Sequence, residues 1–280
     1  MARILAISSQ VARGHVGLSA IVPALQALGH DVIALPTIML SNHPGHPHVA
    51  GERVAPELLR RMLDALATNG WLGEVDAVLT GYLPSVEHVL FAREAVERVR
   101  ERKPQSPILV DPVLGDHPKG LYIARDAAET IRDNLLPHAS IIKLNVFEAE
   151  WLTGRSIATE RDAIGAARAL SSVAVVMTSV PGPDAMLSNM LVAGEAGLCQ
   201  SVRVQHLQRA PHGTGDLLSA LLLGHLMNHD MTLSLALSRA IAGLDAVVRA
   251  SRNNEELLLI DHLASLASCT PLPLADVSNA

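Results

Sequence analysis

Short apolar segments alternate with longer helical segments through the first 180 residues, and this order restricts the fold more than any other feature. The expected strands are continuous apolar or β-branched runs, and they lie at residues 3–8, 31–37, 76–81, 107–112, 140–144 and 173–179. The expected helices between them lie at residues 17–28, 54–69, 85–102, 124–134, 147–153 and 159–171. Apolar strands separated by helices are typical of a parallel sheet that is covered on both faces. The sequence therefore predicts an α/β fold with a doubly wound, mostly parallel sheet.

The order of elements changes after residue 180. The segments "MLSNMLVAG" (186–194) and "SVRVQHLQ" (201–208) predict an antiparallel pair at one edge of the sheet. Three helices are expected after them, at 213–228, 232–251 and 255–267. No linker or repeat divides the chain, so we expect one domain over residues 1–267. The proline-containing end, residues 268–280, predicts a loose tail.

Composition and charge exclude several classes of function. The formal net charge is −6 and aromatic residues make up 2% of the chain, which argues against a nucleic-acid surface. No run approaches the ~20 apolar residues of a membrane span, and the apolar start is too short for a secretory signal. Cys199 and Cys269 show no metal-like spacing. We expect a soluble, cytoplasmic protein with neither nucleic acid nor membrane as a partner.

The stretch "RAPHGTGDLLSALLLGHLM" (209–227) places two glycines and an acid before a long apolar helix. Gly213 and Gly215 leave backbone N–H groups free to point outward, and the helix that begins near Asp216 adds the positive end of its dipole. This arrangement suits phosphate oxygens or a phosphoryl group in transfer, with Asp216 placed to accept a proton from an attacking hydroxyl. The alternative is that Asp216 caps the helix and the glycines only make a turn.

In a parallel α/β sheet, ligands bind at the carboxyl ends of the strands. Polar residues stand at this end of every expected parallel strand, and with the 213–228 helix they outline one crevice. In strand order they are Ser9, then Thr37 to His43, Gly81 with Tyr82, Asp111, Asn145 to Glu148, and Thr178 with Ser179.

Two motifs bring carboxylates to this crevice. In "LNVFEAE" (144–150), Asn145 and Glu148 stand three apart at a strand-to-helix junction, which suits either an outer-sphere Mg²⁺ site or a helix N-cap with a first-turn acid. In "LVDPVLGD" (109–116), Asp111 follows three apolar residues. It needs a charge partner such as Mg²⁺, a monovalent cation or a lysine, unless it is a structural carboxylate at a strand end.

The histidine-rich segment "SNHPGHPHVAG" (41–51) is divided by prolines and glycine, which favours a mobile loop over the crevice rather than a zinc site. His43 in this loop is placed to reach a substrate. His15 and His212 are expected in turns beside the same crevice.

Four segments, in this order, resemble those of pyridoxal kinases, in the ribokinase-like superfamily of small-molecule kinases. They are "ISSQVARGHVG", "LSNH", "DPVLGD" with "NVFEAEWLTG", and "GTGDLLSALLLGHL". The resemblance covers about residue 3 to residue 250, and the ordered set is more specific than any one segment. It implies a ribokinase-like three-layer sandwich with a mostly parallel central sheet, antiparallel edge strands and helices on both faces. It also implies ATP-dependent phosphorylation of the 5′-hydroxymethyl group of pyridoxal, with pyridoxine and pyridoxamine as further substrates in vitamer salvage.

The resemblance assigns roles to individual residues. Asp216 matches the catalytic base, and Gly213, Thr214 and Gly215 match the anion hole. The positions that hold or line the pyridine ring are Ser9, Thr37, His43, Tyr82 and Tyr122, with Asp216 beside the reacting hydroxyl. The nucleotide, phosphate and metal positions are Asp111, Asn145, Glu148, Thr178, Ser179, Arg209, Ala210, Pro211 and His212, with Asp111 and Glu148 as the metal pair. Mg²⁺, a monovalent cation such as K⁺, and a homodimer are implied as well.

The chain departs from this pattern at several positions. Gln10 follows the first-strand serine where the pattern has histidine, the loop reads "SNHPGH" instead of "SNHTGY", and Lys143-Leu144 replaces a Thr-Pro pair. Lys143 would bring a positive charge to the implied cation site. Two alternatives stay open: a hydroxymethylpyrimidine kinase of the same superfamily, and a catalytically silent pyridoxal-binding protein.

Overall fold

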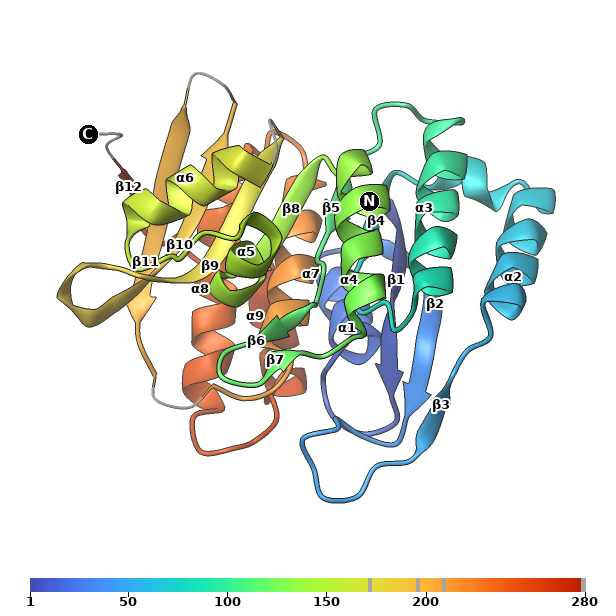
Figure 1. Cartoon of the computed structure of the whole chain (residues 1–280), viewed down its shortest axis with the longest axis horizontal. Coiled ribbons are helices and arrows are strands. Elements are labelled where there is room, and N and C mark those ends of the chain that lie inside the picture. The colour runs from blue at the N-terminus through green and yellow to red at the C-terminus, as the bar shows by residue number, and fades with distance from the viewer. Residues whose placement is uncertain (171–172, 195–196, 208–209, 278–280) are drawn as a thin grey trace.

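A ten-stranded mixed sheet forms the middle layer of the structure, a computed structural model that describes residues 1–170, 173–194, 197–207 and 210–277. The strand order is β12-β11-β10-β9-β8-β5-β4-β1-β2-β3 (Figure 1). The stretch from β9 to β2 in this order is parallel, whereas β10, β11 and β12 at one edge and β3 at the other are antiparallel to their neighbours. The strands are β1 (Arg3–Val11), β2 (Asp31–Leu40), β3 (Gly51–Arg53), β4 (Ala77–Thr80), β5 (Ile108–Val110), β8 (Ile141–Asn145), β9 (Ala174–Pro181), β10 (Met186–Ala193), β11 (Leu198–Gln205) and β12 (Leu274–Asp276). A separate hairpin follows β5 and consists of β6 (Gly115–Asp116) and β7 (Gly120–Leu121).

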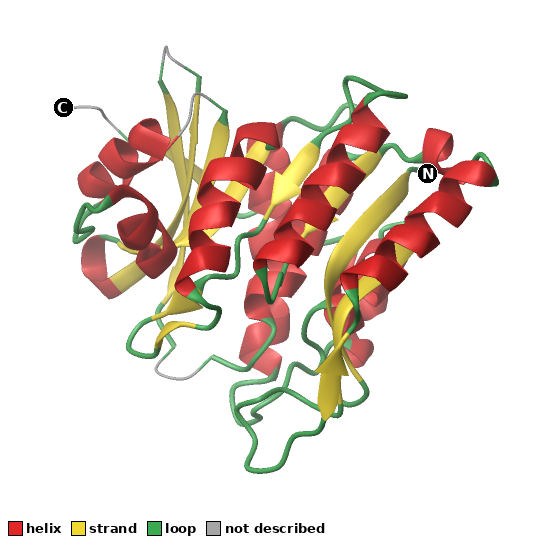
Figure 2. Ribbon diagram, turned by 45° about the vertical axis from the view of Figure 1, so that its right-hand side comes forward, coloured by secondary structure: helices red, strands yellow, loops and turns green. Residues whose placement is uncertain are grey.

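Helices cover both faces of the sheet, which lies between them in Figure 2. One layer contains α2 (Pro56–Thr68), α3 (Val86–Arg100), α4 (Arg125–Thr130), α5 (Val146–Thr153) and α6 (Glu160–Leu170). The other layer contains α1 (Leu18–Ala27), α7 (Thr214–Leu226), α8 (Leu233–Ala250) and the short α9 (Leu263–Leu266). Each layer packs its own hydrophobic core against the sheet. The predicted three-layer α/β architecture is therefore confirmed.

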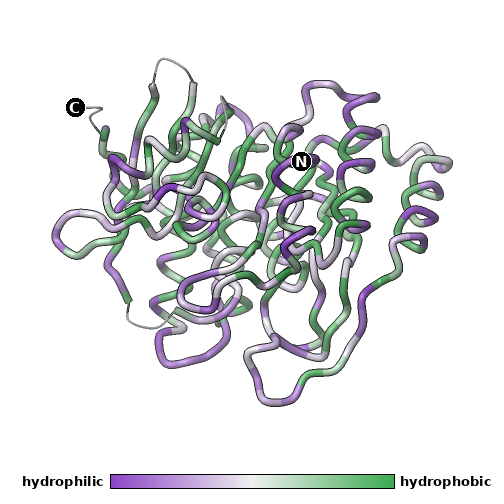
Figure 3. The backbone as a smooth tube through the Cα atoms, in the orientation of Figure 1, coloured by the Kyte–Doolittle hydropathy of each residue, from purple (hydrophilic) through white to green (hydrophobic). Residues whose placement is uncertain are grey.

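The burial pattern explains why these segments take these forms. Every residue of β4 and β5 is buried, as expected for parallel strands with helices on both sides. The helix α2 is amphipathic: hydrophobic and hydrophilic residues alternate around its turns (Figure 3), and it buries Leu59 and Leu63. By contrast, α7 is buried continuously from Leu217 to His225, because α1 and α8 pack on it from either side.

The described structure differs from the sequence-based prediction in the C-terminal region. The expected tail is not loose throughout, because Leu274–Asp276 pairs with β11 as β12. The expected 255–267 helix is confined to residues 260–266. Before it the chain forms a turn, an isolated bridge at Glu256 and a short irregular segment. Leu257 and Leu259 of this segment are buried in the second core, whereas Leu258 is exposed.

Four short strands, β3, β6, β7 and β12, were not expected from the sequence. Each has two or three residues, so none is long enough to show an alternating pattern. Among the described residues, the structure contains no helix that is both long and apolar enough to span a bilayer.

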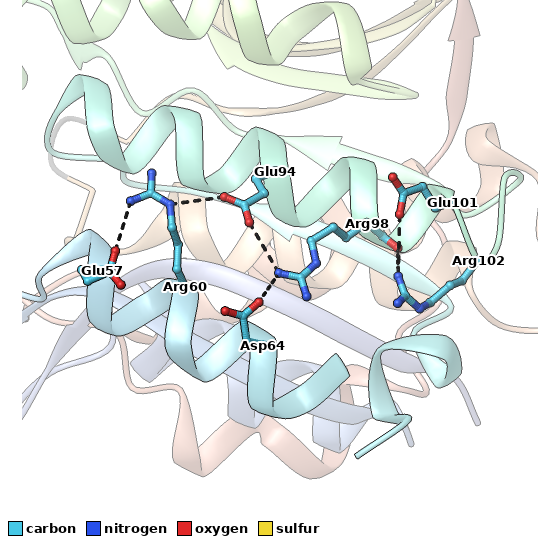
Figure 4. Close-up of polar contacts among 7 residues, drawn as sticks. All are labelled: Glu57, Arg60, Asp64, Glu94, Arg98, Glu101 and Arg102. Atoms are coloured by element: carbon cyan, nitrogen blue, oxygen red, sulfur yellow. Dashed lines mark hydrogen bonds and ion pairs between the residues drawn. The ribbon is translucent and has the colours of Figure 1, made fainter. Parts of the chain in front are cut away.

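A network of ion pairs joins the exposed sides of α2 and α3 (Figure 4). Arg60 of α2 pairs with Glu94 of α3 at 3.2 Å, and Arg98 of α3 pairs with Asp64 of α2 at 2.7 Å. Asp64 is 64% exposed, so water and salt weaken these attractions. The hydrophobic contacts beneath the network, which include fully buried Phe91 of α3, should hold the two helices in place.

We therefore expect Phe91→Ala to lower the free energy of unfolding by about 3–5 kcal/mol, because it leaves a cavity in the core. The matched change on the exposed side of the same helix, Arg98→Ala, should cost less than about 1 kcal/mol. Urea unfolding of both variants measures the difference. Equal losses would contradict the view that the core, rather than the ion network, fixes α3.

Candidate functional site

The carboxyl ends of the parallel strands meet the N-terminus of α7 at one edge of the sheet. Gly213 is the residue before α7 and has a left-handed backbone, with φ 93° and ψ 1°. A Cβ on Gly213 would overlap the carbonyl oxygen of His15, so only glycine fits at this position. The loop before α1 is thereby packed directly against the turn before α7.

Asp216 lies in the first turn of α7 and is half-buried. Its carboxylate accepts a hydrogen bond from the backbone N–H of Gly17, the residue before α1, so it lies at the N-termini of two helices. Burial, helped by the charge of Asp111, raises the pKa of Asp216 to about 6, although the Gly17 hydrogen bond and Lys143 oppose this shift. A carboxyl group with this pKa can both accept and release a proton near neutral pH.

Gly17 and Gly81 hold the neighbouring walls of the site close to Asp216. A Cβ on Gly17, where φ is 55°, would overlap the backbone oxygen and the side-chain oxygen of Ser9. A Cβ on Gly81 would overlap Ser8 Oγ and would stand 3.9 Å from Asp216 Oδ1. Gly81 therefore lies beside Asp216, and Ser9 lies against Gly17, whose N–H donates to Asp216.

Asp111 follows β5 and is 2% exposed. Its Oδ2 accepts a 2.7 Å hydrogen bond from Lys143 Nζ and another of 2.7 Å from Ser219 Oγ. Lys143 lies in β8 and Ser219 in α7, so this carboxylate ties the sheet to the first turns of the helix. Of the charge partners that the sequence left open for Asp111, the lysine is present in the structure.

Glu148 and Asn145 form a complete capping box at the start of α5. Asn145 Oδ1 accepts from the N–H of Glu148 at 2.9 Å, while Glu148 accepts from the N–H groups of Asn145 at 2.8 Å and Leu114 at 2.9 Å. The bond to Leu114 fixes the loop in which Val113 has a positive φ of 44°. A β-branched residue rarely adopts this backbone, and such strain is common at functional sites.

The electrostatics of Glu148 differ from those of an exposed capping residue. Burial raises its pKa to about 7, with the charge of Asp111 adding to the shift and Lys143 opposing it. The helix-capping alternative is thus correct in geometry, yet the carboxyl group also lies within the electrostatic field of Asp111 and Lys143.

The polar residues expected around the ring of the substrate form a second group. Thr37 Oγ1 donates to the carbonyl oxygen of Tyr82 at 2.7 Å, and the N–H of Tyr82 donates to Ser8 Oγ at 3.1 Å. Tyr82 is half-buried, and burial raises the pKa of its phenol. These contacts join the ends of β1, β2 and β4.

The histidine loop closes against the turn before α7. The rings of His43 and His212 are stacked, with centroids 3.8 Å apart, and His46 approaches His212 edge-on at 6.4 Å. Burial, followed by the charge of His212, lowers the pKa of His43 to about 4, so this ring is neutral at physiological pH. A cavity of about 480 Å³ lies beside His46 and is lined by the 254–261 segment together with Arg13 and His15.

The remaining predicted residues are less closely joined to Asp216. Thr178 is buried and its Oγ1 lies 3.4 Å from the carbonyl oxygen of Leu144, while Ser179 is exposed and has a φ of 60°. Tyr122 is half-exposed; burial and a hydrogen bond with Asp116 raise the pKa of its phenol. Ala210 is exposed, Pro211 is buried, and Arg209 lies outside the described residues.

Sequence analysis missed three contributors to the site: Ser8, Gly17 and Ser219. Ser219 stands three residues after Asp216, which is the spacing that puts two side chains on one face of a helix, and this signal could have identified it. Gly17 could be recognised only in the structure, where its N–H donates to the carboxylate of Asp216. Within the described residues, no group of three or more His, Cys, Asp or Glu side chains is arranged to hold a metal ion.

Comparisons with known proteins identify relatives that match most of this chain. A family model described as phosphomethylpyrimidine kinase matches residues 14–257. Pyridoxal kinase PdxY of Corynebacterium diphtheriae is 32% identical, over 94% of this chain and 95% of its own. The chain belongs to the pyridoxal kinase family. Pyridoxal kinase PdxY of Deinococcus radiodurans is 34% identical over 91% of this chain and 90% of its own. In structure, the chain resembles pyridoxal kinase of Leishmania donovani in complex with ADP and pyridoxamine, with a TM-score of 0.89, 29% identity, and coverage of 96% of this chain and 98% of that one.

Gly213→Ala should destabilise the chain more than Gly70→Ala does. The two glycines have nearly the same backbone, φ 93° and ψ 1° against φ 81° and ψ −6°, but a Cβ on Gly70 meets no atom within 4 Å. Gly70→Ala should cost about 1–2 kcal/mol of backbone strain. Gly213→Ala should add roughly 1–3 kcal/mol from overlap with His15. Urea unfolding measures both costs, and equal values would rule out a packed contact at Gly213.

Proposed function

We propose that this chain is an ATP-dependent kinase that phosphorylates the 5′-hydroxymethyl group of pyridoxal, and also that of pyridoxine and pyridoxamine. The observation that carries the proposal is Asp216, half-buried at the N-termini of α1 and α7 with its pKa raised to about 6. Relatives of the chain support this class of substrate. One from Bordetella avium, 36% identical over 80% of this chain, is named pyridoxine/pyridoxal/pyridoxamine kinase. Structures of the Leishmania donovani enzyme with ADP and either pyridoxamine or pyridoxine support it as well.

Asp216 acts as the general base. Its carboxylate takes the proton of the 5′-hydroxyl group while the hydroxyl oxygen forms a bond to the γ-phosphorus of ATP. The bond between that phosphorus and the β,γ-bridging oxygen breaks, and ADP leaves. The hydrogen bond from Gly17 holds the carboxylate in position for this proton transfer.

Backbone N–H groups at Gly213, Thr214 and Gly215 form the anion hole. Gly213 precedes α7 and the other two residues begin it, so all three lie at the N-terminus of a helix of 13 residues, whose dipole places partial positive charge there. Hydrogen-bond donors fixed before the reaction stabilise the charge that develops on the phosphoryl group without further reorganisation. Because Gly213 has no side chain, this turn packs directly against the carbonyl oxygen of His15, and that contact holds the turn in place.

Asp111 and Glu148 would hold Mg²⁺ together with the nucleotide phosphates. The residues fit this ion, because both carboxylates are buried and their charges act on each other, as the raised pKa of Glu148 indicates. Mg²⁺ commonly binds through one or two carboxylates, several waters and substrate phosphates, so a cluster of three protein ligands is not required. When bound, the ion supplies charge neutralisation for the phosphates.

The other predicted residues complete the two substrate sites. We assign Ser9, Thr37, His43, Tyr82 and Tyr122 to the pyridine ring of the vitamer. We assign Asn145, Thr178, Ser179, Arg209, Ala210, Pro211 and His212 to the nucleotide. The stacked rings of His43 and His212 support a common boundary between the two sites. We also infer one domain, a homodimer and a cytoplasmic location. The single continuous sheet supports the one domain, which extends past residue 267 to include β12.

A hydroxymethylpyrimidine kinase is the second candidate. The description of the matching family model favours it, as does a structure of a putative phosphomethylpyrimidine kinase from Bacteroides thetaiotaomicron that resembles this chain with a TM-score of 0.88 and 25% identity. The base and the anion hole would be the same in both kinases. Only the ring pocket would differ.

Asp216→Asn should lower kcat about 10²- to 10⁴-fold, because the amide cannot accept the proton. In the wild type, kcat/KM should rise with pH through about 6, the pKa of Asp216, and then level off. Since the pKa of Asp216 is raised in the folded state, its ionisation destabilises the native chain as pH rises from the ordinary carboxyl pKa to about 6. The variant should therefore be at least as stable as the wild type at pH 8 by urea unfolding. Near-normal turnover by the folded variant would remove Asp216 from the base role.

Direct comparison of substrates separates the candidate functions. Purified chain with ATP and Mg²⁺ should phosphorylate pyridoxal with a higher kcat/KM than hydroxymethylpyrimidine, as followed by ADP release. The reverse order would favour the second candidate. Binding of pyridoxal without any phosphorylated product would favour a catalytically silent protein.

A further inference from the structure

The side-chain ammonium of Lys143 is enclosed within the candidate site. Lys143 is 5% exposed, and its Nζ donates to Asp111 Oδ2 at 2.7 Å. Ser219 Oγ donates to the same oxygen at 2.7 Å. The ammonium also lies against the anion hole, since a Cβ on Gly215 would stand 3.1 Å from Nζ. One positive charge therefore connects the carboxylate after β5 with the first turn of α7.

Three carboxylates act on this one ammonium: those of Asp111, Glu148 and Asp216. The 2.7 Å distance between Nζ and Asp111 Oδ2 is typical of a charge-assisted hydrogen bond, so Lys143 and Asp111 form a buried ion pair. The ammonium offsets part of the negative charge around the place where the phosphoryl group would react.

A monovalent cation, which the family resemblance implies, does not fit beside Asp111 Oδ2 in this chain. That oxygen already accepts from the Lys143 ammonium and from the Ser219 hydroxyl. The ammonium carries the charge that K⁺ would bring. With these two donors in place, Oδ2 has no position left for K⁺. Mg²⁺, which Asp111 and Glu148 would hold with the nucleotide phosphates, does not depend on this oxygen, because Asp111 has a second one, Oδ1.

A purely structural role does not account for the burial of this pair. Buried ion pairs are often no more stable than apolar residues of the same volume. The chain contains a second pair of equal length, Lys103 with Asp76 at 2.7 Å, at the opposite, amino-terminal edge of β4. The side chains of that pair are 39% and 36% exposed, whereas those of Lys143 and Asp111 are 6% and 3% exposed.

We propose that Lys143 replaces the monovalent cation of the site: its ammonium orients Asp111 and neutralises charge beside the anion hole, so this chain binds nucleotide and transfers phosphoryl groups without K⁺. This inference rests on the proposed kinase function. Lys143 is a positioning residue in this scheme, because it acts through Asp111 and through the field at Gly215.

The experiment compares KCl with tetramethylammonium chloride, whose cation is too large for such a site, at equal ionic strength. Initial rates with pyridoxal and the Kd of ADP with Mg²⁺, by calorimetry, are measured for the wild type, Lys143→Thr, Lys143→Met and Lys103→Met. The wild type and Lys103→Met should give the same rates and the same Kd in both salts. Lys143→Met should lose turnover ~10²- to 10³-fold in both salts, the range for removing a fixed electrostatic stabiliser.

Lys143→Thr is the most informative variant, because it removes the positive charge of the ammonium and opens space for K⁺ beside Asp111. It should lose turnover in tetramethylammonium, regain part of it in KCl, and bind ADP more tightly in KCl. Loss of wild-type turnover or ADP affinity when K⁺ is withdrawn would overturn the proposal. This comparison needs only the wild type, so it tests the proposal even if the Lys143 variants do not fold. If pyridoxal is not phosphorylated in either salt, the proposed function fails, while a wild-type ADP Kd that is independent of K⁺ still supports the role of Lys143.

Discussion

The close approach of two helix N-termini is the constraint on which the rest of the site depends. The turn before α7 can touch the loop before α1 only because Gly213 and Gly17 have no side chains, which would otherwise overlap His15 and Ser9. This contact brings the N-termini of α1 and α7 together, and it gives Asp216 a hydrogen bond from Gly17, the residue before α1. The sheet then brings Asp111 and Lys143 to the same place from β5 and β8.

The site concentrates charge that the fold must tolerate. Asp216 and Glu148 both have raised pKa values, mainly because burial disfavours their ionised forms. Ionised at neutral pH, they reduce the stability of the native chain. Two extensive apolar cores, one on each face of the sheet, hold the strand ends in place despite this cost. Active sites commonly keep such destabilising groups because the chemistry requires them.

Much of this arrangement could be predicted from the sequence, because local patterns encode it. The apolar parallel strands predicted the sheet, and the rule that ligands bind at strand ends gathered Ser9, Asp111 and Asn145 at one edge. The Gly-Thr-Gly segment predicted a helix N-terminus at this edge, where we propose the anion hole. Contacts between distant segments could not be predicted in this way. The family resemblance placed the charge of Lys143 at the implied cation site, but no local pattern shows that its ammonium reaches Asp111. The two- and three-residue strands have too few residues for a pattern.

The three-residue strand β12 protects an edge of the sheet. Without it, the eight-residue strand β11 would present a long row of unpaired N–H and C=O groups to solvent. Such an edge is a template for pairing with another chain and a route to aggregation, whereas a very short edge strand offers little to pair with. Truncation of the chain just before Leu274 would therefore uncover β11 and favour aggregation. The removed segment is far from Asp216 in sequence and contributes no catalytic group.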